Sequence, residues 1–75
     1  LGPVQRVVIE LKILHQGLEA TIQQGLLQTA DYADRCGADE SHLIIFNRNP
    51  QVPWQERIWQ REEAVGQSAI SVWGA

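Results

Sequence analysis

The sequence predicts an α/β domain in which one mixed sheet packs against one long helix. Three observations predict this fold class: a β-branched apolar segment near the start of the chain, a helical repeat of apolar residues in its middle, and short alternating segments in its last third. The expected order is strand, helix, strand, strand and strand. With 75 residues and a single cysteine, the chain is expected to form one domain, residues 1–75, without a disulfide.

The composition excludes several classes of protein. Hydrophobic residues make up 44% of the chain and charged residues 20%, which argues against disorder. No apolar segment approaches the roughly 20 residues of a membrane span, and no signal peptide pattern is visible, so no membrane partner is expected. The lone Cys36 is typical of a reducing compartment, most simply the cytoplasm. The net charge of −3 provides no overall attraction to nucleic acid.

The first expected strand runs from Val4 to Leu14. β-branched residues dominate this segment, and its centre is apolar at nearly every position. Such a pattern is typical of a central strand that is buried on both faces, and we expect that position for it. The segment from His15 to Gly17 is expected to break the strand.

Apolar residues at helical spacing predict a helix from Leu18 to Arg35. Intervals of four, four, four and three residues place the apolar side chains on one stripe, formed by Leu18, Ile22, Leu26, Ala30 and Ala33. Gly25 costs about 1 kcal/mol relative to alanine in a helix, so a close approach of the helix to the sheet is the expected reason for it. Gly37 is expected to end the helix in the left-handed conformation.

The remaining chain predicts three shorter strands. The first, Ser41–Asn47, follows a helix long enough to return the chain for a parallel pair with the opening strand. After a loop, Trp54 either opens a helical turn or leads directly into the next strand. Arg57–Glu63 and Ser68–Trp73 then read as two short strands on either side of Gly66, with Ile70 and Val72 facing away from Ser71 and Trp73, and predict a hairpin.

Two opposite charges stand in the middle of the most apolar strand. Glu10 and Lys12 are two residues apart, so they project side by side on the face that also carries Val8 and Leu14. Burial of ionised groups costs several kcal/mol unless they are paired. One explanation is a carboxylate that holds a divalent cation beside an ammonium that orients or deprotonates a water molecule. The other is a salt bridge at a strand end, or an edge strand with one wet face.

The predicted helix carries a second polar pair. Gln28 and Tyr32 are four residues apart and therefore share one helical face, offset from the apolar stripe. A strand with E-x-K followed by a helix with Q-x-x-x-Y resembles the core of the PD-(D/E)XK nuclease superfamily, and most closely its RecB-like branch. More narrowly, residues 5–74 resemble a bacterial nuclease-like domain found at the C-terminal end of AAA-type ATPase proteins. The resemblance implies a partial restriction-endonuclease-like core.

The resemblance also implies an activity, a cofactor and site residues. Members of this superfamily hydrolyse DNA phosphodiesters with Mg²⁺. By resemblance, Glu10 is a metal ligand and Lys12 positions and activates the attacking water. Gln28 orients near the phosphate or the metal shell, and Tyr32 supports it.

The sequence departs from the family pattern at its N-terminal end. The family has an acidic residue on a strand before the E-x-K strand, whereas none of the nine residues before Glu10 is Asp or Glu. One carboxylate is a poor Mg²⁺ site, because the ion usually takes a carboxylate pair or substrate phosphates. We therefore expect that the N-terminal part of the fold is lacking and that this chain alone does not cleave DNA.

Other functions are compatible with the same residues. The alternative is a small non-catalytic binding or assembly module that works as a homo-oligomer, in which strand edges and the tryptophans Trp54, Trp59 and Trp73 form contacts. Either a second chain or a missing N-terminal segment would complete the sheet. A zinc site is not expected, because His15, Cys36 and His42 are widely spaced and the chain has no second cysteine and no close histidine pair.

Overall fold

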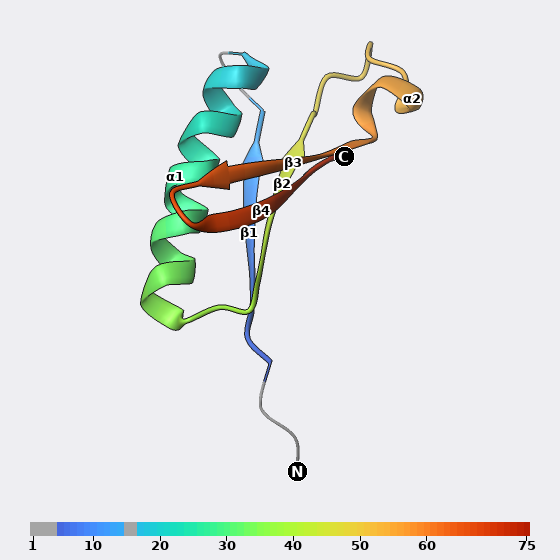
Figure 1. Ribbon diagram of the computed structural model, residues 1–75. Helices are drawn as coiled ribbons and strands as arrows, with labels where there is room; N and C mark the ends of the chain where they lie inside the picture. The colour runs from blue at the N-terminus through green and yellow to red at the C-terminus, as the bar shows by residue number, and fades with distance from the viewer. Residues whose placement is uncertain (1–4, 15–16) are drawn as a thin grey trace.

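Four strands form one mixed sheet against which a long helix packs (Figure 1). The structure, a computed structural model, describes residues 5–14 and 17–75. The elements are β1 (Val7–Ile13), α1 (Leu18–Cys36), β2 (Glu40–Phe46), α2 (Trp54–Arg57), β3 (Trp59–Val65) and β4 (Ser68–Gly74). The predicted fold class and element order are confirmed. The expected strand start at Val4 and the expected break at His15 and Gln16 lie outside the described residues.

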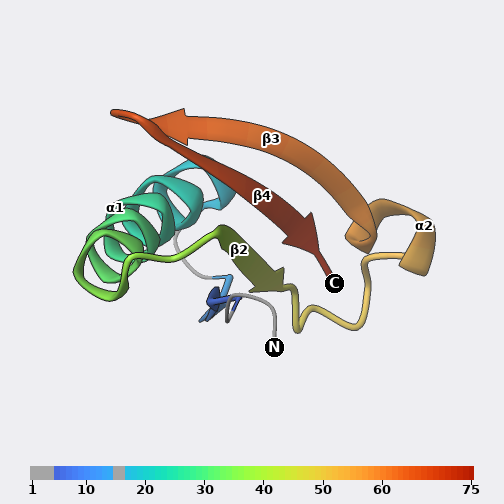
Figure 2. The same cartoon turned by 60° about the horizontal axis from the view of Figure 1, so that its bottom comes forward.

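The strand order in the sheet is β1-β2-β4-β3. β1 pairs with β2 in parallel, β2 pairs with β4 in parallel, and β3 and β4 form an antiparallel hairpin. Figure 2 shows β2, β4 and β3 side by side, with α2 at the start of β3. Gly66, at φ 60°, sits in the hairpin turn as expected, because a left-handed conformation there is easy only for glycine.

One face of the sheet and one stripe of α1 form the core. The fully or nearly fully buried side chains come from α1, β2 and β4: Ile22, Leu26, Leu43, Ile45, Ile70 and Val72. Gly25 lies where α1 crosses β2, and a Cβ atom added there would come within 2.7 Å of the Leu43 Cδ atoms. The close approach predicted from this glycine is therefore confirmed. Gly37 ends the helix at φ 63°, also as expected.

β1 corrects the predicted position of the first strand. It is an edge strand, with β2 as its neighbour, and alternate side chains along it point away from α1. Those side chains, Val7, Ile9, Leu11 and Ile13, are 46–58% exposed. Dense β-branched sequence is typical of strands covered on both faces, but in the described part of the chain only α1 covers this sheet. The expectation of a central strand buried on both faces is wrong for that reason.

The face of the sheet that points away from α1 is here called the open face. Strand alternation and register place on it Val7, Ile9, Leu11 and Ile13 of β1, Glu40, His42, Ile44 and Phe46 of β2, Ala69, Ser71 and Trp73 of β4, and Gln60, Glu62 and Ala64 of β3. Among the described helices, none is long and apolar enough to cross a membrane.

Candidate functional site

Glu10 and Lys12 point to the same side of the sheet as α1. Register pairs Glu10 with Leu43 and Lys12 with Ile45, and both partners are buried under the helix. The two charged side chains are themselves only half-buried, because β1 lies at the edge of the sheet. Glu10 and Lys12 therefore share one face of β1, as their spacing of two residues predicts.

Neither charge is paired with another described residue. Among the described residues, the Glu10 carboxylate and the Lys12 ammonium make no hydrogen bond and no ion pair. The interpretation as a salt bridge at a strand end therefore finds no partner in this part of the chain. The interpretation as an edge strand is half right: β1 is an edge strand, but its more exposed face is the apolar one.

The outer edge of β1 presents backbone groups that have no partner strand among the described residues. The Leu14 N–H donates to the Phe46 carbonyl oxygen at 2.8 Å, and the Arg6 carbonyl oxygen accepts from the Asp39 N–H at 2.8 Å. Even-numbered residues of this segment thus direct their backbone groups toward β2. Successive residues of a strand direct their backbone N–H and C=O groups to opposite sides. The odd-numbered residues from Val7 to Ile13 therefore direct these groups outward, away from β2. No described strand pairs with this edge.

A hollow of about 410 Å³ lies between this edge and α1. It is lined by Val7, Val8, Ile9, Glu10, Tyr32 and Cys36, and it is here called the edge hollow. It brings together Glu10 from β1 and Tyr32 from α1, two of the four residues predicted for the site. Tyr32 is 56% exposed, so its phenol is open to solvent and to a ligand.

The other two predicted residues lie next to the edge hollow rather than in its lining. Lys12 is two residues beyond Glu10 on the same face of β1. Gln28 is exposed on α1, one turn before Tyr32 and on the same helical face. The structure therefore places all four residues on the side of the sheet that α1 covers, but it joins only Glu10 and Tyr32 in one cavity.

The edge hollow supplies too few ligands for a complete metal site. Glu10 is the single carboxylate in its lining. Throughout residues 5–14 and 17–75, no three His, Cys, Asp or Glu side chains gather in a way that could hold a metal ion. The residues fit one coordination position of a hard cation such as Mg²⁺, and the other positions would need oxygen atoms from elsewhere.

A polar network on the open face was missed by the sequence reasoning. The Trp73 indole N–H donates to His42 Nδ1 at 3.1 Å, and His42 Nε2 lies 3.5 Å from Glu40 Oε2. The Ser71 hydroxyl donates to Glu62, at 3.0 and 3.1 Å from the two carboxylate oxygens. Since Nδ1 accepts a bond, the neutral imidazole carries its proton on Nε2. Only strand pairing reveals this network, because its members are up to 31 residues apart.

Cys36 and His42 do not converge. Cys36 lines the edge hollow on the α1 side, whereas His42 lies on the open face. The third possible zinc ligand of the sequence, His15, lies outside the described residues.

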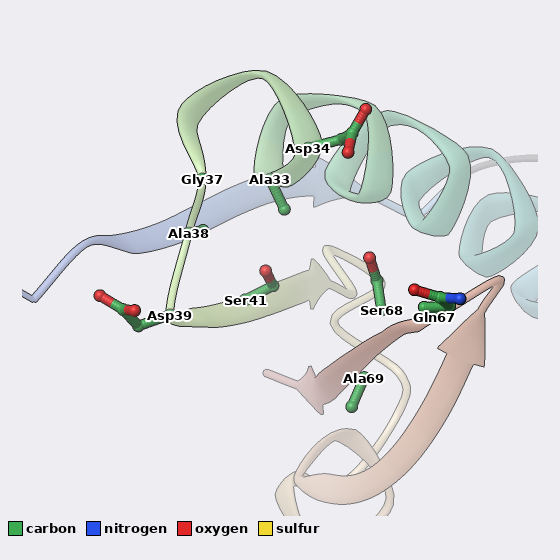
Figure 3. Close-up of a pocket in the computed structure, with 9 residues that line it drawn as sticks. All are labelled: Ala33, Asp34, Gly37, Ala38, Asp39, Ser41, Gln67, Ser68 and Ala69. Carbon is green, nitrogen blue, oxygen red and sulfur yellow. The ribbon is translucent and has the colours of Figure 1, made fainter.

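A second hollow, of about 390 Å³, lies between the end of α1 and the starts of β2 and β4 (Figure 3). The Ser41 and Ser68 side chains point toward the helix in this view, while Asp39 points away from the hollow. Asp39 is already engaged, since its carboxylate accepts a hydrogen bond from the Arg6 N–H at 2.8 Å. Asp34 is the other carboxylate of the lining, so the hollow has no close carboxylate pair.

One ion pair ties the sheet to the start of α1. The Arg61 guanidinium of β3 donates two hydrogen bonds of 3.1 Å to the Glu19 carboxylate. These bonds, with the attraction of the positive charge, lower the pKa of Glu19, and the same bonds raise the pKa of Arg61. The pair joins β3 of the hairpin to the first turn of α1, and neither of its residues lines the edge hollow.

Comparison of the chain with known protein families, curated proteins and solved structures found no match.

Proposed function

We propose that this chain carries part of a metal-dependent nuclease site, with DNA phosphodiesters as the substrate class and Mg²⁺ as the cofactor. The single observation that carries the proposal is the edge hollow: its lining includes both Tyr32 and Glu10, which has no partner among the described residues, and it lies beside a strand edge with which no described strand pairs. The resemblance of E-x-K and Q-x-x-x-Y to the PD-(D/E)XK pattern supplies the chemistry. We also propose a cytoplasmic location, which the single free Cys36 supports.

Each residue has a role that its position allows. Glu10 supplies a hard oxygen ligand, and a divalent cation bound there would neutralise charge on a phosphate. Lys12, on the same face of β1, stabilises the negative charge that develops at phosphorus and orients the attacking water. Tyr32 donates a hydrogen bond toward the same space. Gln28, one helical turn away, contacts the phosphate or the waters around it.

The site is incomplete in this chain. One carboxylate leaves most of the cation's coordination positions unfilled. The free edge of β1 lies beside Glu10, and a further strand paired there would bring its own side chains to the edge hollow. We therefore propose that a carboxylate from such a strand completes the site, and that without it the chain binds cations weakly and does not cleave DNA.

Paramagnetic broadening by Mn²⁺ in NMR spectra of the chain tests the proposal. Sub-stoichiometric Mn²⁺ is expected to broaden first the amide signals around Glu10 and Tyr32, because these residues line the same hollow. Glu10→Gln removes the charge and is expected to abolish that broadening. Glu62→Gln, on the open face, is the matched control and is expected to leave it unchanged.

Two results would contradict the proposed site. One is broadening that starts elsewhere and spares the edge hollow. The other is broadening at the edge hollow that persists in Glu10→Gln, since the carboxylate would then not be the ligand.

A further inference from the structure

The open face carries a continuous apolar patch. Six large apolar side chains on it are 39–58% exposed: Val7, Ile9, Leu11, Ile13, Phe46 and Trp73. Register makes them neighbours across three strands, because Leu11 pairs with Ile44 and Ile44 pairs with Trp73. These residues are here called the β1 patch.

The polarity of β1 is the reverse of that of an ordinary surface strand. Its four patch residues face solvent, while Glu10 and Lys12 face the helix. A strand with one solvated face normally turns its polar residues to water and its apolar residues to the core. Sheets that are parallel throughout occur almost only with both faces covered, and three of the four strands of this mixed sheet, β1, β2 and β4, run in parallel. The open face thus has the composition of an interface.

The size of the β1 patch matches half of a dimer interface. Six large side chains at this exposure amount to roughly 500 Å² of apolar surface, toward the upper end of the ~300–600 Å² found for the largest patch of a typical monomer. Two such patches together bury on the order of 1,000 Å² before the surrounding polar side chains are counted. Stable interfaces bury about 1,200–2,000 Å² in total, so the two apolar patches supply most of the required area and the polar side chains around them have to supply the rest.

We propose that the β1 patch is the contact surface of a symmetric homodimer, in which the open faces of two copies pack against each other as a sandwich. A two-fold axis places the same patch on both sides, so apolar meets apolar without any further complementarity. Sheets packed in this way lie about 10 Å apart with their strands roughly aligned. The dimer covers the open face and leaves Glu10 and Tyr32 on the α1 side, although Val7 and Ile9 border both the β1 patch and the edge hollow.

The surroundings of the β1 patch fit a second copy better than a lipid surface. Glu40 and Glu62 lie on the open face beside it, so an anionic bilayer, which is negative over its whole surface, would repel this face, whereas a second copy fits in an orientation that keeps these carboxylates at the rim of the contact. Trp73 is held by its hydrogen bond to His42, which leaves a pre-positioned aromatic side chain in the patch. Aromatic anchors of this kind are enriched among the residues that dominate interface energies.

Sedimentation or light scattering of the chain from about 1 µM to about 100 µM tests the dimer, because self-association follows mass action. The wild-type chain is expected to reach twice the monomer mass within this range. Leu11→Lys puts a charge at the centre of both copies of the patch and is expected to raise the dissociation constant at least about 100-fold. Leu27→Lys is the matched control, since Leu27 is 63% exposed on α1 and the substitution is the same.

Several outcomes would overturn the proposed dimer. A wild-type chain that stays monomeric at the highest concentration overturns the dimer, whatever the variants show. A dimer that survives both Ile9→Lys and Leu11→Lys assigns the contact to another surface, such as the β1 edge. Binding to vesicles of anionic lipid without self-association assigns the patch to a membrane. Circular dichroism of each variant shows that a loss of dimer is not a loss of fold.

Discussion

At the scale of single residues, the spacing of Glu10 and Lys12 and the glycine at Gly25 illustrate what a short pattern determines. A spacing of two residues on a strand places both side chains on one face, and in the structure this is the face that α1 covers. A glycine in a helix that is otherwise apolar on one stripe indicates a close contact, and Leu43 is that contact. Neither pattern reveals the partner, because the partner comes from a distant segment.

Gly25→Ala is expected to destabilise the protein. The new Cβ would lie 2.7 Å from the Leu43 Cδ atoms, and Leu43 is fully buried, so it has little room to move. Overpacking costs about 1–3 kcal/mol, which exceeds the roughly 1 kcal/mol that alanine gains in helix propensity. Urea unfolding is expected to show a net loss of about 1 kcal/mol. Gln24→Ala, at an exposed position of the same helix, is the control, and equal stability of both variants would mean that α1 moves away freely.

At the scale of secondary structure elements, ties between segments distant in sequence hold the sheet and helix together. α1 packs on β2 and β4 through its apolar stripe, and its first turn is joined to β3 by Glu19 and Arg61. The stripe was predictable from helical spacing. The ion pair was not, because its partners are 42 residues apart and only the hairpin geometry brings them together.

The Glu19–Arg61 pair predicts a pH dependence of stability. The pKa of Glu19 is lowered on folding, so its contribution is present above the unfolded pKa of a glutamate and is lost as the pH falls through the lower folded value. The stability difference between wild type and Glu19→Gln is therefore expected to favour wild type at neutral pH and to shrink on acidification. The difference is small because the pair is exposed.

Urea midpoints at neutral and acidic pH measure this effect. Glu56→Gln is the control, since Glu56 is exposed and its side chain has no hydrogen bond or ion pair with another described residue. A difference for Glu19→Gln that does not change with pH would contradict the assignment.

At the scale of the whole molecule, two boundaries that the described residues leave uncovered each carry one proposal. The outer edge of β1 offers backbone groups beside the edge hollow, where a further strand would complete a nuclease site. The open face offers the β1 patch, where a second copy would complete the layer structure. The two boundaries lie on one strand but face different directions, so both can be occupied at once.

The nuclease proposal predicts that the chain alone does not nick DNA. Plasmid incubated with the purified chain and Mg²⁺ is expected to stay supercoiled, since one carboxylate cannot fill the coordination shell of the ion. Electrophoresis of the plasmid is the measurement. Clear Mg²⁺-dependent nicking that Lys12→Ala abolishes would show that the chain is a complete enzyme, contrary to this prediction.

Local periodicity predicts the long helix, the four strands and their order along the chain, but it leaves open the helical turn that α2 forms at Trp54. It also determined that Glu10 and Lys12 share a face and that Gln28 and Tyr32 share another. Strand pairing and layer packing, which no local pattern reveals, make β1 an edge strand, turn its apolar side to solvent, and place Tyr32 rather than Gln28 with Glu10 in the lining of one cavity. The physical reason is that strand order and layer packing depend on pairing between distant segments. An apolar strand has the same sequence whether both its faces are covered by its own chain or one face still awaits a partner.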